Sequence, residues 1–287
     1  MLVANWLNVW YTTYVEQSKD LAPSTKAQYR RSIAAVPDWL GAADLADPLL
    51  PLSLHRWVQQ VAAVYPRAAQ LDRTMLSRAL RIASKLGLCS TMVMDTDLVP
   101  KPSHRPKKTL VLTSAQAREY RQAAQAVRSY PLLMLCLCGL RRGEALGARW
   151  QDLHGDMLHV CRQRQKVEGK LVSRRLKSES SERTLQLPPW LLADLAATPR
   201  TITGWILDTT PDLMYKDHRR VLHAAQLPPV TLHGLRHTFA TEAARQGLPM
   251  KHLQTALGHA KVKLTADLYA DHLDPLSALP ALVWSSF

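Results

Sequence analysis

A run of prolines and cations between positions 99 and 108 divides this chain into two parts. The run reads VPKPSHRPKK and holds three prolines and four lysine or arginine residues, with no acidic residue. Proline lacks a backbone N–H and clashes with the preceding helical turn, so the run interrupts any helix and makes poor strand. We predict a helical domain over residues 1–100, a basic linker over residues 101–108 and a second domain over residues 109–287. A length of 287 residues is also long for one domain.

Apolar residues in the first part recur at the spacing of one helix face. The clearest stripe, at i, i+3, i+4 and i+7, is formed by Leu7, Trp10, Tyr11 and Tyr14. A second stripe runs from Met75 to Leu86 and ends at Gly87, a residue that commonly follows a helix. These patterns predict a compact helical bundle.

The second part begins and ends with helical patterns and changes period between them. Thr113 and Gln116 have the spacing of a capping box, which opens a helix. Between residues 157 and 187, apolar and polar residues alternate, which predicts short antiparallel strands with a turn at Glu168–Gly169. The predicted fold class is therefore mainly α, with a small antiparallel β-sheet in the second domain.

Charge favours a polyanionic partner. Lysine and arginine total 37 against 23 acidic residues, a formal net charge of +14. Neutralising phosphates releases counterions, so this excess favours nucleic acid over an anionic membrane surface. A basic protein without a specific partner, and a merely solvated linker, remain alternatives. The candidate DNA contacts are Lys26, Arg30, Arg31, Lys101, Arg105, Lys107, Lys108, Arg174 and Arg175.

Several other classes of protein are disfavoured. Four cysteines are too few for a disulfide framework at this length, and Cys136 and Cys138 lie in an apolar run where they resemble small buried hydrophobic residues. No metal-ligand set is evident. The N-terminus lacks a signal-peptide pattern, and no apolar run approaches the roughly 20 residues of a membrane span. We expect a cytoplasmic protein without a membrane partner or a metal.

The second part contains the polar residues that are candidates for catalysis. Arg141 lies in GLRRGE, and an arginine fork can bind two phosphate oxygens at once. His233 and Arg236 are three residues apart, so a helix places them on one face. Taken alone, each of these residues also has an ordinary structural explanation. Arg141, for example, fits a surface cation that pairs with Glu144. His237 suggests a metal pair with His233, but no third ligand supports it.

The order of these signals resembles the tyrosine recombinase (phage integrase) family. The pattern is an arginine in G-L-R-x-G-E, a lysine in a hairpin, H-x-x-R, L-G-H and then a tyrosine. Residues 231–241, TLHGLRHTFAT, are similar to the family's central motif almost letter for letter. The resemblance covers roughly residues 112–273. The first part is similar in kind to the family's helical core-binding domain, and we expect no separate arm-binding domain before it.

The resemblance implies a role for each matching residue. Arg141 and Arg236 would hold the non-bridging oxygens of the scissile phosphate, and His259 would hydrogen-bond it. Tyr269 would be the nucleophile, with His233 helping to remove its proton. Lys177 would protonate the leaving 5′-oxygen, and it fits the family's hairpin motif better than Lys166 or Lys170. Neither a metal nor another cofactor is required.

The resemblance also implies partners. The chain would act on double-stranded DNA at specific sites, through a 3′-phosphotyrosyl intermediate and a Holliday junction. It would work as a homotetramer on two DNA sites, in a bacterial or phage-infected cell, associated with the nucleoid. The apolar tail over residues 275–287 would dock onto a neighbouring protomer or pack on its own domain. The alternatives are a type IB-like DNA topoisomerase and a catalytically inactive DNA-binding protein of the same fold.

Overall fold

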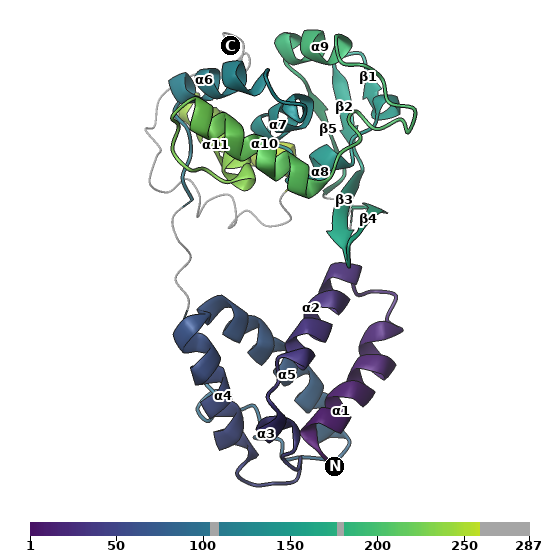
Figure 1. The fold of residues 1–287 in the computed structure, drawn as a ribbon, viewed down its shortest axis with the longest axis vertical. Helices are drawn as coiled ribbons and strands as arrows, with labels where there is room; N and C mark the ends of the chain where they lie inside the picture. The colour runs from purple at the N-terminus through teal and green to yellow at the C-terminus, as the bar shows by residue number, and fades with distance from the viewer. Residues whose placement is uncertain (104–108, 177–180, 259–287) are drawn as a thin grey trace. The chain divides into compact units, whose positions relative to one another are not determined.

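The computed structural model of the 287-residue chain describes residues 1–103, 109–176 and 181–258 (Figure 1). It divides into two compact units, Met1–Lys107 and Lys108–Phe287. The named elements of the first unit are all helices, whereas the second unit contains helices and short strands. Among the described residues, no helix has both the length and the apolar character that crossing a membrane requires.

The first unit is a helical bundle, as its apolar stripes predict. Its elements are α1 (Val3–Trp10), the π-helical turn η1 (Tyr11–Glu16), α2 (Pro23–Ala34), α3 (Asp38–Gly41), α4 (Leu50–Val64) and α5 (Pro66–Lys85). Trp6 and Trp57 are buried in its core, and the Trp6 Nε1–H donates to the Ala79 carbonyl at 3.0 Å. Pro66 occupies the first turn of α5, where its missing N–H is not needed.

The π-helical turn changes which residues face this core. A π-helix has a longer repeat than an α-helix, so the apolar stripe moves by one position. Val15 is buried, whereas Tyr14 is 43% exposed. The predicted stripe is therefore correct through Tyr11 and wrong at Tyr14.

The start of the predicted linker packs on the first unit. The Val99 carbonyl accepts from Arg73 Nε at 2.7 Å, and the Pro102 carbonyl accepts from Gln70 Nε2 at 2.8 Å. Pro102 is buried. These contacts join residues 99–102 to α5.

The second unit confirms the predicted class of helices with small antiparallel sheets. Its helices are α6 (Ser114–Ala124), α7 (Tyr130–Leu137), α8 (Arg142–Leu146), η2 (Trp150–Asp152), α9 (Pro189–Ala196), α10 (Pro211–Ala224), α11 (Leu232–Arg245) and α12 (Met250–Leu257). Its strands are β1 (Leu153–His154), β2 (Met157–Val160), β3 (Arg162–Val167), β4 (Lys170–Arg175) and β5 (Arg183–Gln186). In the described part of the chain they form two sheets, β1-β2-β5 and β3-β4, rather than the one expected.

Two local predictions in this unit are confirmed. Thr113 and Gln116 form the capping box that opens α6. Glu168 and Gly169 form the turn between β3 and β4, with positive φ angles of 46° and 81°. The turn therefore joins two strands paired from Arg162 with Arg175 to Val167 with Lys170.

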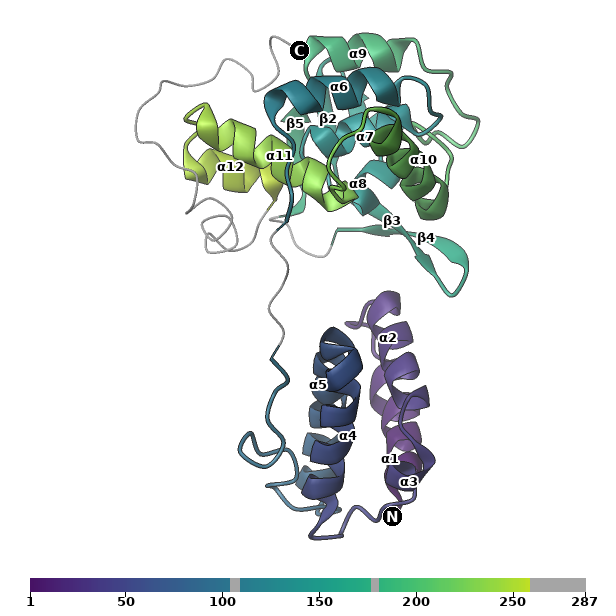
Figure 2. The ribbon, with the colours of Figure 1, turned by 60° about the vertical axis from the view of Figure 1, so that its left-hand side comes forward.

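Helix α7 lies at the centre of the second unit. Residues 131–137 are buried on every side, and α7 packs against α8, α9 and α11. Burial raises the pKa of the Cys136 and Cys138 thiols to about 12, so both behave as the small buried hydrophobic residues expected. Figure 2 shows α11 and α12 side by side at one flank of this unit.

A buried histidine links α6 and α10 to the segment that leads into α11. The Nε2–H of His218 donates to the Val230 carbonyl at 2.9 Å, since a carbonyl can only accept. Nδ1 therefore accepts from the Tyr120 hydroxyl at 2.7 Å. His218 is 1% exposed, and burial lowers its pKa, although the bond to Val230 acts in the opposite direction.

We expect this histidine to make the fold sensitive to acid. Its pKa is lower in the folded than in the unfolded state, so the unfolded chain binds the proton more readily. Its contribution to stability is complete above the ordinary histidine pKa of 6.5 and is lost as the pH falls towards the folded pKa. Urea unfolding between about pH 7.5 and 5.5 should show a smaller pH dependence for His218→Gln than for the wild type. Equal pH dependence in both would contradict this role.

Candidate active site

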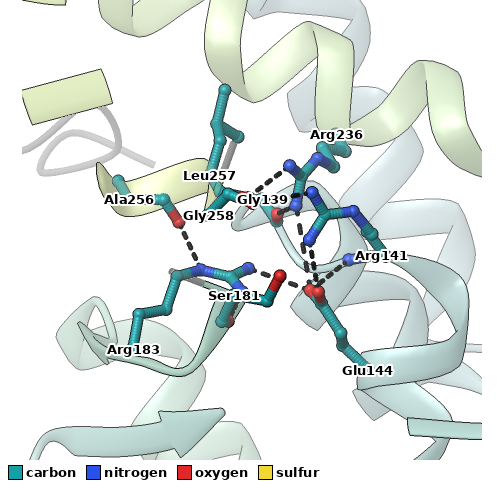
Figure 3. A network of polar contacts seen from close by, with 9 residues as sticks. All are labelled: Gly139, Arg141, Glu144, Ser181, Arg183, Arg236, Ala256, Leu257 and Gly258. Carbon is teal, nitrogen blue, oxygen red and sulfur yellow. Dashed lines mark hydrogen bonds and ion pairs between the residues drawn. The ribbon is translucent and has the colours of Figure 1, made fainter. Parts of the chain in front are cut away.

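The carboxylate of Glu144 lies against guanidinium groups from distant parts of the second unit (Figure 3). Arg141 Nη1 lies 2.6 Å from Glu144 Oε1, and Arg183 Nη2 lies 2.9 Å from Oε2. Arg236 Nη1 is 3.8 Å from the same Oε2. The Glu144 side chain is only 1% exposed, so this carboxylate is a buried counter-ion rather than a surface partner of Arg141.

The GLRRGE segment places Arg141 and Glu144 by its backbone. Helix α7 ends before Gly139, whose φ of +98° turns the chain, and a Cβ there would lie 2.9 Å from the Phe239 ring. Arg141 then caps α8, and its backbone N–H donates to Glu144 Oε2 at 2.8 Å. A carboxylate three residues into a helix accepts well from the capping N–H. The motif therefore fixes both ends of the Arg141–Glu144 pair.

Arg236 projects from α11 into the same cluster. Its Nη1 donates to the Gly139 carbonyl at 2.8 Å, and its Nη2 donates to the Leu257 carbonyl at 2.5 Å. Arg141 Nη2 donates to the neighbouring Gly258 carbonyl at 2.9 Å. Arg236 has a 2% exposed side chain and Arg141 a 35% exposed one. Arg141 is therefore the more exposed of the two guanidinium groups.

The cluster keeps Glu144 ionised. Burial by itself raises the pKa of Glu144, but the hydrogen bond and charge of Arg183, followed by the charge of Arg141, lower it below the ordinary value of 4.5. Within the described residues, Arg141, Arg183 and Arg236 thus share one buried carboxylate and leave an excess of positive charge. Such a site is suited to bind a phosphodiester.

His233 lies in the first turn of α11, next to this cluster. The turn is capped by Thr231, whose Oγ1 accepts from the Gly234 N–H at 2.9 Å. Partial burial lowers the pKa of His233, and the charges of Arg236 and Arg141 lower it further, whereas Glu144 raises it. The imidazole is therefore mainly neutral at pH 7 and able to accept a proton.

His237 packs edge-on against His233, with ring centroids 4.4 Å apart and an interplanar angle of 84°. In the described ranges, no group of histidine, cysteine or acidic side chains is arranged to hold a metal ion. The pair is a ring contact on α11.

The structure thus brings Arg141, His233 and Arg236 together, as expected of a common site. Lys177, His259 and Tyr269 lie outside the described residues, and so do Arg105, Lys107 and Lys108.

The two other hairpin lysines have visible surroundings. Lys166 is half exposed on β3, and its Nζ donates to Asp212 Oδ2 on α10 at 2.5 Å. Lys170 is exposed at the start of β4. Lys166 is therefore already engaged within the second unit.

The predicted DNA-contacting cations of α2 are partly engaged within the first unit. Lys26 Nζ donates to the Glu16 carbonyl at 2.6 Å, and Arg30 Nη2 to Glu16 Oε1 at 3.1 Å. Arg31 is exposed and donates to the Gln28 side chain at 3.1 Å. Lys26 and Arg30 therefore lie against η1. Lys101 and Arg175 are exposed, and Arg174 is half-buried on β4.

Sequence reasoning missed two features. Arg183 is not among the expected site residues, and its burial arises from contacts with remote segments. The second is a surface hollow of about 540 Å3 on α10, lined by Tyr215, Lys216, Arg219, Arg220 and His223. The i, i+3 and i+4 spacing of its Lys and Arg side chains was the available signal.

Parts of this chain are similar to known proteins. The phage integrase family matches residues 207–275. A tyrosine recombinase XerC-like protein of Caldanaerobacter subterraneus subsp. tengcongensis is 26% identical over 194 residues, which are 55% of this chain and 49% of the relative. The match thus spans about half the length of that relative.

Solved structures share the fold across both units. The Tn1549 transposon integrase, in complex with circular intermediate DNA, has a TM-score of 0.75 at 19% identity, covering 94% of this chain and 95% of that one. A lambda integrase tetramer bound to a Holliday junction has a TM-score of 0.68 at 18% identity, covering 91% and 78%. This fold carries an arginine cluster around Glu144. The chain is similar to the tyrosine recombinase (phage integrase) family.

Proposed function

We propose that this chain is a site-specific DNA recombinase that cuts and rejoins DNA through a 3′-phosphotyrosyl intermediate. The observation that carries the proposal is the convergence of Arg141 and Arg236 on buried Glu144, with neutral His233 beside them. Two guanidinium groups held by protein contacts are preorganised for the charge that grows on the phosphate oxygens in the transition state. The first unit would be the core-binding domain and the second the catalytic domain.

The proposed chemistry needs only side chains of this chain. The Tyr269 oxygen attacks phosphorus, and the bond from phosphorus to the 5′-oxygen breaks. A free phenol has a pKa of roughly 10, so it needs a base at neutral pH, and in this proposal His233 accepts that proton. Lys177 donates a proton to the leaving 5′-oxygen, and His259 hydrogen-bonds the phosphate. The phosphotyrosine link conserves the bond energy, and a 5′-hydroxyl from another strand reverses the step.

The proposed assembly is a homotetramer on two DNA sites. The lambda integrase tetramer on a Holliday junction, which has the same fold, supports this arrangement. The tail over residues 275–287 would join neighbouring protomers. A phage or mobile-element integrase and a chromosome-dimer resolvase both fit this chemistry.

The function is tested by trapping. The full-length chain is incubated with nicked duplexes from a library of the source genome, and denaturant-resistant protein–DNA adducts are sequenced. Adducts at a defined site support the recombinase. Relaxation of supercoiled DNA without sequence preference would instead indicate a type IB-like topoisomerase. Specific binding without any adduct would indicate an inactive DNA-binding protein.

The α10 hollow is expected to contact the DNA backbone. Replacing Arg219 and Arg220 by alanine should weaken DNA binding similarly for all sequences. The slope of log affinity against log salt should become smaller by about 2, since each lost phosphate contact removes about one unit. Fluorescence anisotropy at several salt concentrations measures this slope. Arg200→Ala, at an exposed arginine after α9, is the control that should leave it unchanged. An unchanged slope in the double variant would contradict the contact.

A further inference from the structure

Successive backbone carbonyls at the end of α12 are each bound by a different arginine. Residues 256–258 close this helix, and Gly258 has the positive φ of +60° that is common just after a helix end. The last carbonyls of a helix have no intrahelical partner, so outside donors stabilise them. The pairs are Arg183 Nε to Ala256 O at 2.6 Å, Arg236 Nη2 to Leu257 O at 2.5 Å, and Arg141 Nη2 to Gly258 O at 2.9 Å.

The same arginines meet Glu144 on their other side (Figure 3). The end of α12 and the carboxylate of α8 therefore enclose the guanidinium groups. Arg236 and Arg141 are the groups expected to hold phosphate. The Nε, Nη1 and Nη2 atoms of Arg183 all donate to protein acceptors, which favours a structural role for this arginine.

Arg183 uses each part of its guanidinium on a different segment. Nε bonds to Ala256 of α12, Nη2 to Glu144 of α8, and Nη1 to the Ser181 carbonyl at 3.1 Å, just before β5. A Cβ on Gly258 would lie 3.1 Å from Arg183 Nη1, so the absent side chain leaves room for this arginine. A lysine has a single nitrogen and cannot span these acceptors.

We propose, building on the proposed function, that Arg183 is a positioning residue which holds Glu144 and the end of α12 together and thereby aims Arg141 and Arg236 at the scissile phosphate. The hydrogen bonds of Arg183 to these segments, and not its positive charge alone, position Arg141 and Arg236. Misplacing a phosphate-binding group by about 1 Å lowers a rate by about 100-fold. The defect of an Arg183 variant should therefore lie in the chemical step and depend on the charge of the phosphate.

The test compares Arg183→Lys with the full-length wild type on two suicide duplexes. One duplex carries an ordinary scissile phosphate. The other carries a methylphosphonate, which lacks one negative charge and so depends less on guanidinium alignment. We expect Arg183→Lys to lose about 100-fold in adduct formation on phosphate, about 10-fold or less on methylphosphonate, and little DNA affinity.

Arg121→Lys is the matched control. Arg121 is also partly buried, pairs with Asp194 at 3.4 Å and stacks on Trp190. It should lose stability without changing the ratio of the two rates. Should Arg183→Lys fail to fold, Arg183→Gln keeps Glu144 for Arg141 and Arg236 and replaces the guanidinium by an amide that cannot span the three acceptors. We expect the same phosphate-dependent loss from it.

Three outcomes are distinguishable. A folded Arg183→Lys with the wild-type rate on phosphate would overturn the positioning role. Equal losses on phosphate and methylphosphonate would also overturn it, because the defect would not act through the phosphate-binding arginines. Absence of adducts from the wild type on its own site would instead overturn the proposed function.

Discussion

Replacing Glu144 by alanine is expected to lower the free energy of unfolding by about 3–5 kcal/mol, the usual effect of removing one partner of a buried ion pair. The side chains of Arg183 and Arg236 are 4% and 2% exposed, so their charges would stay buried without this carboxylate. Urea unfolding at pH 7, followed by circular dichroism, measures the change.

Glu242→Ala is the control for this prediction. Glu242 pairs with Arg245 at 3.9 Å, and the arginine is 46% exposed. Surface pairs contribute about 0–1 kcal/mol, so we expect a change in that range. A loss of less than about 1 kcal/mol for Glu144→Ala would show that the cluster does not depend on its carboxylate.

The ionisation of Glu144 gives this prediction a pH dependence. The pKa of Glu144 is lower in the folded state than its ordinary value of 4.5. Its stabilising contribution is therefore complete above the unfolded pKa and is lost as the pH falls through the folded pKa. The difference between the wild type and Glu144→Ala should shrink in acid.

Residues with a fixed spacing in the sequence were predictable, and residues joined by tertiary contacts were not. The H-x-x-R spacing places His233 and Arg236 on one helix face, and G-L-R fixes Arg141 at a helix start. The burial of Glu144 depends on Arg183, which is 39 residues away in the chain. A short-range pattern therefore presents Glu144 as a surface partner of Arg141.

For the strands too, positions were predictable from the sequence and tertiary partners were not. Alternating polarity predicts where strands occur, but it does not specify their partners. Here β2 pairs with β5, whereas β3 pairs with β4 across the Glu168–Gly169 turn, and two sheets result in the described chain. Likewise, the stripe from Leu7 to Tyr11 predicts α1, but the π-helical turn that exposes Tyr14 has no such signal.

The proposed nucleophile, Tyr269, gives the largest expected effect. Tyr269→Phe should abolish covalent attachment to DNA, because phenylalanine has no oxygen to form the bond to phosphorus. The aromatic ring remains, so DNA affinity should stay close to that of the wild type. Tyr65→Phe, at a tyrosine that is 66% exposed in the first unit, is the control and should attach normally.

The most direct test of the account is the yield of denaturant-resistant adduct on a suicide duplex carrying the chain's own site. The wild type and Tyr65→Phe are compared there with Tyr269→Phe, and the DNA-linked peptide is identified by mass spectrometry. We predict attachment through Tyr269 in the first two proteins and none in the third. Attachment by Tyr269→Phe at the wild-type yield would contradict the account.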